Sequence, residues 1–436
     1  MTILSRFLHG AARARGQNRV MLDLFPATAA VADDTLETGG CRADELAAEF
    51  GTPLVVYCEQ TIRGAARAYR EAAPEGTTIV YGTKAFANVA VMRVLADEGL
   101  GADVSTIGEL AFARAAGLTG DGLVFHGNNK SDDELRAAAE TDALVVLDSP
   151  DEPARAAAAG VRHALVRLTP GIDAATHHAI RTAHAESKFG LGPADALRTI
   201  GDALTRGIDV LGVHLHIGSQ LTRADETLEA VARAAEVCER ASTELGWRPR
   251  VVDLGGGLGV RTHPADVVPT IAEFVGMLVE RFREAWPRDV GLILEPGRSL
   301  VGRAGVTLYR VGVVKQSGDV AYVAVDGGMS DNPRPQLYGA RYTALLASRA
   351  AEPTTKTFRV AGKHCESGDV MIEEVELPEP VRGDLLAVPA TGAYTLAMGS
   401  RYNGVPQPAV VLVRDGSARL IRRRESVDEL LRYEEE

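Results

Sequence analysis

Along residues 78–298, short apolar runs alternate with longer stretches in which apolar residues recur at helical spacing. Each run has the length of a buried strand, and each longer stretch has the period of an amphipathic helix. The eight runs are TIVYGTKAF (78–86), ADVST (102–106), GLVFHGN (122–128), ALVVLD (143–148), HALVRL (163–168), DVLGVHLHIG (209–218), RVVDLGGG (250–257) and GLILEPGR (291–298). Regular alternation predicts a parallel sheet covered by helices, and eight units predict a closed (β/α)8 barrel.

Three of the intervening stretches are the best helix candidates, namely residues 88–101, 131–140 and 227–245. The second begins with Ser131 and carries Glu134 three residues later. This spacing is typical of a capping box, in which each side chain binds the other residue's backbone N–H. The sequence therefore predicts a helix start at this position.

After Arg298 the pattern changes to β-rich segments separated by glycine turns, which predicts an all-β second domain. The apolar run at 53–59 and the segment near 20–48 precede the barrel strands, so we expect them to join the β domain. The predicted organisation is a disordered extension (1–20), a β domain (21–59 and 299–436) and a barrel (60–298).

Composition narrows the class of protein. The chain has 436 residues, 46% of them apolar, which is enough for a large core. The net charge of −12 argues against nucleic acid or anionic membranes as partners. Four distant cysteines without metal-ligand spacing suit a reducing cytosol, and no apolar run is long enough to span a bilayer. We therefore expect a cytoplasmic protein without a resident metal.

Polar residues gather where the predicted strands end. In a barrel of this kind, the carboxyl ends of all strands meet at one rim, where active sites lie. The residues at this rim are Lys84, Asp103, His126–Asn128, His216–Ser219, Gly255–Gly257 and Glu295–Arg298. Six of eight strand ends carry such groups, which predicts one shared site and places Asp103 among the candidate binding residues.

Three of these features together indicate a cofactor. A lysine inside a barrel strand would lack a solvent face, so Lys84 is better explained as an amine that forms a Schiff base. The glycines of GGGLG (255–259) follow the seventh strand, where backbone N–H groups commonly hold a phosphate. Glu295 ends an apolar run and can pair with a protonated ring nitrogen. A lysine, a phosphate cradle and a carboxylate together indicate pyridoxal 5'-phosphate.

From about residue 22 to its end, the chain resembles the alanine-racemase-fold (fold-type III) pyridoxal-phosphate decarboxylases, most closely the diaminopimelate decarboxylases. The barrel motifs that carry this resemblance are YGTKAFANVAV (81–91), HGNNKS (126–131), HLHIGSQ (214–220), LGGGLG (254–259) and EPGR (295–298). The resemblance implies that Lys84 binds the cofactor covalently, that His216 stacks on its ring and that Glu295 meets its ring nitrogen. It also implies that Ser219, Gly255, Gly256, Gly257 and Arg298 lie at the phosphate, with Arg298 near the substrate as well.

Three motifs of the β domain extend the resemblance, namely DGGMSDNPRPQLYGARY (326–342), CESGD (365–369) and GAYTLAMGSRYN (392–403). By resemblance, Arg334 and Tyr338 contact the substrate, and Tyr394 contacts both phosphate and substrate. Cys365 and Glu366 would enter the site of a neighbouring subunit, which implies a homodimer with shared active sites. A buried, inert thiol is the alternative for Cys365.

The resemblance implies decarboxylation of meso-2,6-diaminopimelate to L-lysine and CO2, the last step of lysine biosynthesis. Glu366 and Arg334 offer an acid and a cation for the distal ammonium and carboxylate of this substrate. Cys365 or Lys84 would return the proton. Three alternatives stay open: a decarboxylase of ornithine, arginine, carboxynorspermidine or a natural-product substrate; a racemase; and a non-catalytic regulator.

Overall fold

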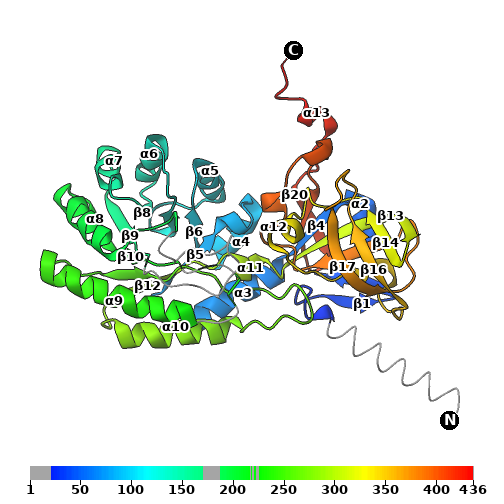
Figure 1. Ribbon diagram of the computed structural model, residues 1–436, viewed down its shortest axis with the longest axis horizontal. Coiled ribbons are helices and arrows are strands. Elements are labelled where there is room, and N and C mark those ends of the chain that lie inside the picture. The colour runs from blue at the N-terminus through cyan, green and yellow to red at the C-terminus, as the bar shows by residue number, and fades with distance from the viewer. Residues whose placement is uncertain (1–20, 170–186, 217, 219, 222–224, 436) are drawn as a thin grey trace, which may run out of the picture. The chain divides into compact units, whose positions relative to one another are not determined.

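The computed structural model describes residues 21–169, 187–216, 218, 220–221 and 225–435. The chain forms two compact units, each built from distant stretches of sequence. Counting only the described residues, the sheet unit takes those of Met1–Ile62, Val260–Val267 and Val301–Glu436, and the barrel unit takes those of Arg63–Gly259 and Val268–Leu300. Both are drawn in Figure 1.

The barrel unit contains a closed barrel of parallel strands, which confirms the predicted fold class. Its strands follow the order β10-β11-β12-β5-β6-β7-β8-β9, so β12 pairs with β5 and closes the sheet. The strands are β5 (Thr78–Gly82), β6 (Gly101–Val104), β7 (Leu123–Phe125), β8 (Leu144–Leu147), β9 (His163–Arg167), β10 (Asp209–His214), β11 (Val251–Asp253) and β12 (Gly291–Leu294). Each lies inside one of the eight apolar runs or starts within a residue of it.

Helices surround these strands (Figure 1). They are α3 (Glu59–Ala72), α4 (Val89–Asp97), α5 (Ile107–Ala116), α6 (Asp132–Glu140), α7 (Glu152–Ala158), α8 (Pro193–Thr205), α9 (Asp225–Leu245), α10 (Ile271–Ala285) and α11 (Arg298–Val301). The predicted capping box at the start of α6 is confirmed, since Ser131 Oγ accepts from the Glu134 N–H and the Glu134 carboxylate accepts from the Ser131 N–H.

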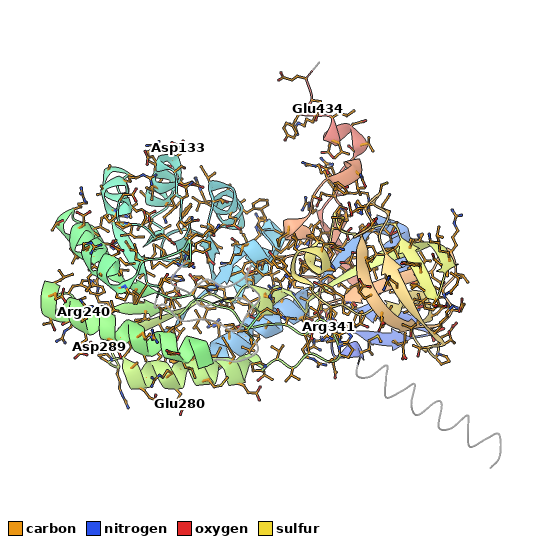
Figure 2. The ribbon with its side chains drawn as sticks, in the orientation of Figure 1. Asp133, Arg240, Glu280, Asp289, Arg341 and Glu434 are labelled. Atoms are coloured by element: carbon orange, nitrogen blue, oxygen red, sulfur yellow. The ribbon has the colours of Figure 1, made fainter. Side chains whose placement is uncertain are left out.

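The barrel helices are amphipathic because only one face of each meets the strands. Figure 2 shows Asp133 of α6, Arg240 of α9 and Glu280 of α10 on outward faces, and all three are exposed. The opposite face of α10 buries Phe274 and Leu278. No helix in the described part of the chain is long and apolar enough to cross a bilayer.

The sheet unit is built around a nine-stranded sheet, counted over the described residues. The N-terminal strand β4 (Leu54–Cys58) pairs antiparallel with β13 and parallel with β19, so this early segment does join the later β-rich one. The other strands are β13 (Gly305–Ser317), β14 (Val320–Val325), β15 (Leu345–Leu346), β16 (Lys356–Ala361), β17 (Val370–Leu377), β18 (Leu385–Pro389), β19 (Ala409–Arg414) and β20 (Ser417–Arg422).

Smaller elements complete the sheet unit. A three-stranded sheet contains β1 (Ala30–Ala32), β2 (Thr35–Thr38) and β3 (Cys41–Arg42). Its helices are α2 (Ala43–Phe50), α12 (Arg334–Tyr338) and α13 (Val427–Leu430). Residues from β2, α2, β4 and β19 share one apolar core, which explains why the N-terminal segment belongs to this unit.

A buried lysine links two strand ends of the barrel. Lys130 is 2% exposed, and its Nζ donates to Gly127 O at 2.6 Å, to Val146 O at 2.7 Å and to the Glu152 carboxylate at 2.7 Å. We expect Lys130→Met to lower the free energy of unfolding by about 3 to 5 kcal/mol, because Glu152 would be left buried without its cation. Denaturant unfolding measures this loss.

The matched control is Arg136→Met, which breaks the exposed Arg136–Asp133 pair on α6. Exposed pairs contribute little, so a change below about 1 kcal/mol is expected. Equal losses in the two variants would contradict the structural role of the buried pair.

Candidate active site

Every strand of the barrel carries an ionisable or hydrogen-bonding side chain at or just after its carboxyl end. Because the strands are parallel and the barrel is closed, these side chains come from one rim. They are Lys84 (β5), Asp103 (β6), His126 (β7), Asp148 (β8), Arg167 (β9), His214 and His216 (β10), Asp253 (β11) and Glu295 (β12). The rim can therefore hold a charged, polar ligand from all sides.

Lys84 does not lie inside a strand, so this part of the sequence interpretation was wrong. Strand β5 ends at Gly82, and Lys84 is the middle residue of the 3-10 turn Thr83–Ala85. Its side chain is 45% exposed, and its Nζ lies 3.4 Å from the carboxylate of buried Asp103. The Thr83 hydroxyl donates to the Asp103 carbonyl and ties the turn to β6. The amine is thus accessible and faces a fixed counter-ion.

Glu295 directly follows β12 and is buried among histidines. One carboxylate oxygen lies 2.6 Å from His126 Nε2, and the other lies 3.2 Å from His214 Nε2. Burial alone would raise the pKa of Glu295, but the two histidines outweigh it and hold that pKa well below its usual range. A carboxylate that stays ionised in a dry site can favour a protonated ring nitrogen beside it.

Two further groups complete this buried cluster. Burial lowers the pKa of His214 to about 3, so the ring stays neutral and donates to Glu295 through Nε2. Asp253 is the register partner of His214 on the neighbouring strand. Burial and the nearby Glu295 charge raise the pKa of Asp253 well above its usual range, so it is held protonated, and its Oδ1 accepts from the Gly255 N–H at 2.8 Å. The cluster therefore carries its negative charge on Glu295.

The glycine triplet forms a tight loop after β11. Gly255 and Gly257 adopt positive φ of 65° and 118°, which favours glycine. A Cβ on Gly256 would lie 2.2 Å from the Glu295 carbonyl oxygen, so no side chain fits there. The Gly256 and Gly257 N–H groups donate to no backbone carbonyl within the described residues. Backbone N–H groups in a loop without side chains fit a phosphate group.

The remaining predicted barrel residues lie at the same rim, with one exception. His216 follows β10, and burial and the Lys84 charge hold its pKa well below the usual range. Arg298 is buried and begins α11, three residues after Glu295. Ser219 lies outside the described residues.

In the sheet unit, the substrate candidates Arg334 and Tyr338 share the short helix α12. Arg334 is buried, and its guanidinium carbon lies 5.5 Å from the centre of the Tyr338 ring. Tyr394 follows β18 and adopts a positive φ of 57°, a costly conformation for a side chain of this size. The backbone around Tyr394 is therefore tightly specified.

Cys365 and Glu366 lie on an exposed turn, so the alternative of a buried Cys365 thiol is wrong. The Cys365 N–H donates to the Asn403 side chain at 2.9 Å. Just before it, buried His364 lies 2.7 Å from the Asp369 carboxylate through Nδ1. Asp369 also accepts from the Met329 and His364 N–H groups. The turn is thus held by hydrogen bonds at both ends, and the Cys365 side chain is exposed to solvent.

Sequence reasoning missed four charged or polar residues at the rim, namely His214, Asp253, Asp148 and Arg167. Arg167 lies 3.4 Å from Asp148 and is buried beneath the Phe189 ring. The available signal was the same for all four: a polar side chain at the end of an apolar run. Only the presence of partners in the folded barrel separates such residues from ordinary surface groups.

These features define a class: a barrel enzyme whose rim pairs an accessible lysine with a glycine phosphate cradle and a buried, ionised carboxylate. Residues 59–302 match the family described as "Pyridoxal-dependent decarboxylase, pyridoxal binding domain". The chain belongs to this family of pyridoxal-dependent decarboxylases.

Similarity to particular members extends over nearly the whole chain. The chain is 43% identical to the diaminopimelate decarboxylase of Actinosynnema pretiosum, covering 96% of this chain and 97% of that one. It is 41% identical to the enzyme of that name from Bacillus subtilis, covering 92% and 95%. Among solved structures, diaminopimelate decarboxylase from M. jannaschii in complex with L-lysine has a TM-score of 0.86, at 32% identity over 93% and 97%.

Proposed function

We propose that this protein removes carbon dioxide from meso-2,6-diaminopimelate and forms L-lysine, the last step of lysine biosynthesis. The observation that carries the proposal is the rim itself: Lys84, the glycine cradle and ionised Glu295 come together on one barrel. Similarity to diaminopimelate decarboxylases over nearly the whole chain, at 43% and 41% identity, supports the choice of substrate.

The residues present fit pyridoxal phosphate. Lys84 holds the cofactor covalently, and Gly255, Gly256 and Gly257 hold its phosphate through backbone N–H groups. Glu295 would accept a hydrogen bond from the protonated ring nitrogen, and His216 would lie against the ring. Ser219, Arg298 and Tyr394 complete phosphate binding, and Asp103 orients Lys84 through the 3.4 Å contact. When bound, the cofactor withdraws the electrons released as carbon dioxide leaves.

The other residues act on the substrate. Arg334 binds its distal carboxylate with two parallel N–H groups, and Glu366 binds the distal ammonium. Tyr338, Tyr394 and Arg298 complete the pocket. The proton that replaces the carboxylate comes from Cys365 or Lys84; the exposed thiol is free to act as donor.

We further propose a cytoplasmic homodimer in which Cys365 and Glu366 serve the partner's active site. Their turn is exposed and held in place by Asn403 and Asp369, as expected of a segment that contacts another chain. In this proposal, residues 60–298 form the cofactor-binding barrel, and residues 21–59 with 299–436 form the β domain.

Product analysis tests the reaction. Purified protein with pyridoxal phosphate is incubated separately with meso-diaminopimelate, L-lysine, ornithine and arginine, and carbon dioxide and amines are measured. We expect lysine from diaminopimelate and no product from the others. Ornithine and L-lysine belong in the set because the lysine/ornithine decarboxylase of Vibrio vulnificus is a structural neighbour, with a TM-score of 0.76 at 26% identity. Turnover of either would overturn the substrate assignment.

Arg334→Lys tests the distal carboxylate contact. Lysine keeps the charge but loses the two-pronged geometry, so we expect kcat/KM for diaminopimelate to fall by about 10²-fold. The matched control is Arg341→Lys, an exposed arginine on the same segment that pairs with Asp266 at 3.2 Å. An equal fall in both variants would remove the role given to Arg334.

A further inference from the structure

His126 lies between two buried carboxylates. Its Nε2 is 2.6 Å from Glu295 Oε1 and 3.6 Å from Asp103 Oδ1. The three residues come from different strand ends, β7, β12 and β6, and all are buried. Asp103 Oδ1 has no hydrogen-bond partner in the described part of the chain. The imidazole N–H is therefore the group that separates the two acids.

These contacts form a continuous path across the rim. Lys84 Nζ faces Asp103 at 3.4 Å, Asp103 faces His126, and His126 donates to Glu295, which also binds His214 at 3.2 Å. The path joins the lysine to the carboxylate that meets the ring nitrogen. Two carboxylates in a low-dielectric interior repel each other strongly unless a donor lies between them.

A metal ion would be another use of this cluster. Single ligand atoms from His126, His214, Asp253 and Glu295 all lie within 4.8 Å of one another. However, 2.6 Å between His126 and Glu295 is a hydrogen-bond distance, whereas ligands of a tetrahedral zinc ion lie about 3.3 Å apart. Burial and the Glu295 charge raise the pKa of Asp253 well above its usual range, and a protonated carboxyl is a poor ligand for a cation. Hydrogen bonding accounts for the cluster better.

We propose that His126 is a positioning residue that orients Glu295 for the cofactor's ring nitrogen and shields it from Asp103, the acid beside Lys84. The proposal rests on the proposed function only for the identity of the bound cofactor. His214 also binds Glu295, but its other ring contact is edge-on to His126, with centroids 4.6 Å apart. His126 therefore differs from His214 in that it lies between Glu295 and Asp103 and separates the two carboxylates.

The test is a double-mutant cycle on the full chain. Two quantities are measured for each variant: the Tm of thermal unfolding without cofactor, and the dissociation constant for pyridoxal phosphate. His126→Leu fills the site but removes the donor, so we expect at least tenfold weaker cofactor binding and a Tm about 5 °C lower. His126→Gln places an amide N–H within similar reach of Glu295, so it should restore most of the lost cofactor affinity and most of the lost Tm. Adding Asp103→Asn to His126→Leu removes one of the repelling charges and should recover at least half of the Tm loss.

His214→Leu is the matched control. It also removes a donor to Glu295 and should lower Tm, but adding Asp103→Asn to it should bring no recovery of Tm.

If His126→Leu does not accumulate, His126→Asn replaces it, because its amide is too short to bridge both acids. Additive effects of His126→Leu and Asp103→Asn, or a Gln variant as weak as the Leu variant, would overturn the proposal. Neither readout uses the substrate, so failure of the wild type to form lysine would count against the proposed function alone.

Discussion

Replacing Lys84 with alanine will abolish covalent attachment of pyridoxal phosphate and lower kcat by about 10³-fold or more. The expected cause is chemical rather than structural, because Lys84 is 45% exposed and belongs to a short turn. Borohydride reduction followed by peptide mass measurement reads out the attachment directly. Wild-type protein should carry the cofactor on the peptide that contains Lys84, and the variant should carry none.

The control for this experiment is Lys315→Ala, which removes an exposed lysine of β13. It should leave attachment, kcat and Tm unchanged. Cofactor attached to another lysine in Lys84→Ala, with activity retained, would refute the assignment. A fall in Tm of cofactor-free Lys84→Ala similar to that of Lys130→Met would instead show that Lys84 is structural.

Glu295→Gln is expected to lower kcat by about 10²- to 10³-fold while the cofactor still attaches to Lys84. Glutamine keeps the size of the side chain and an acceptor for His126, but removes the charge that favours a protonated ring nitrogen. Since the histidines hold the pKa of Glu295 well below its usual range, the wild-type kcat profile should show no step from this group between about pH 5 and 8.

The control is Glu98→Gln. Glu98 is also a largely buried carboxylate of the barrel unit, but it forms ion pairs with Arg63 and Arg67, at 2.9 and 2.8 Å. Its loss should lower Tm and leave kcat intact. If Glu295→Gln changes only Tm, or if its kcat matches the wild type, Glu295 does not act on the cofactor.

Much of the barrel could be predicted from the chain because its signals are local. Eight apolar runs separated by helical stretches specify strands and helices in turn, and closure follows from their number. Ser131 and Glu134 are three residues apart, so their capping box needs no tertiary information. The β-rich pattern after Arg298 likewise predicted a sheet. The place of β4 between β13 and β19 could not be predicted in this way, because it depends on pairing with segments about 250 and 350 residues away.

The sequence by itself determined the order of the barrel strands and which polar residues lie near their carboxyl ends, and so supplied Lys84, the glycine triplet and Glu295 as candidates at one rim. It did not determine that Lys84 leaves the strand for an accessible turn, because strand ends depend on pairing with neighbours. Nor did it determine that His126 and His214 bind the two oxygens of Glu295, since His126 and Glu295 are 169 residues apart. Only barrel closure brings such residues together, and only burial among those partners decides which carboxylate is charged.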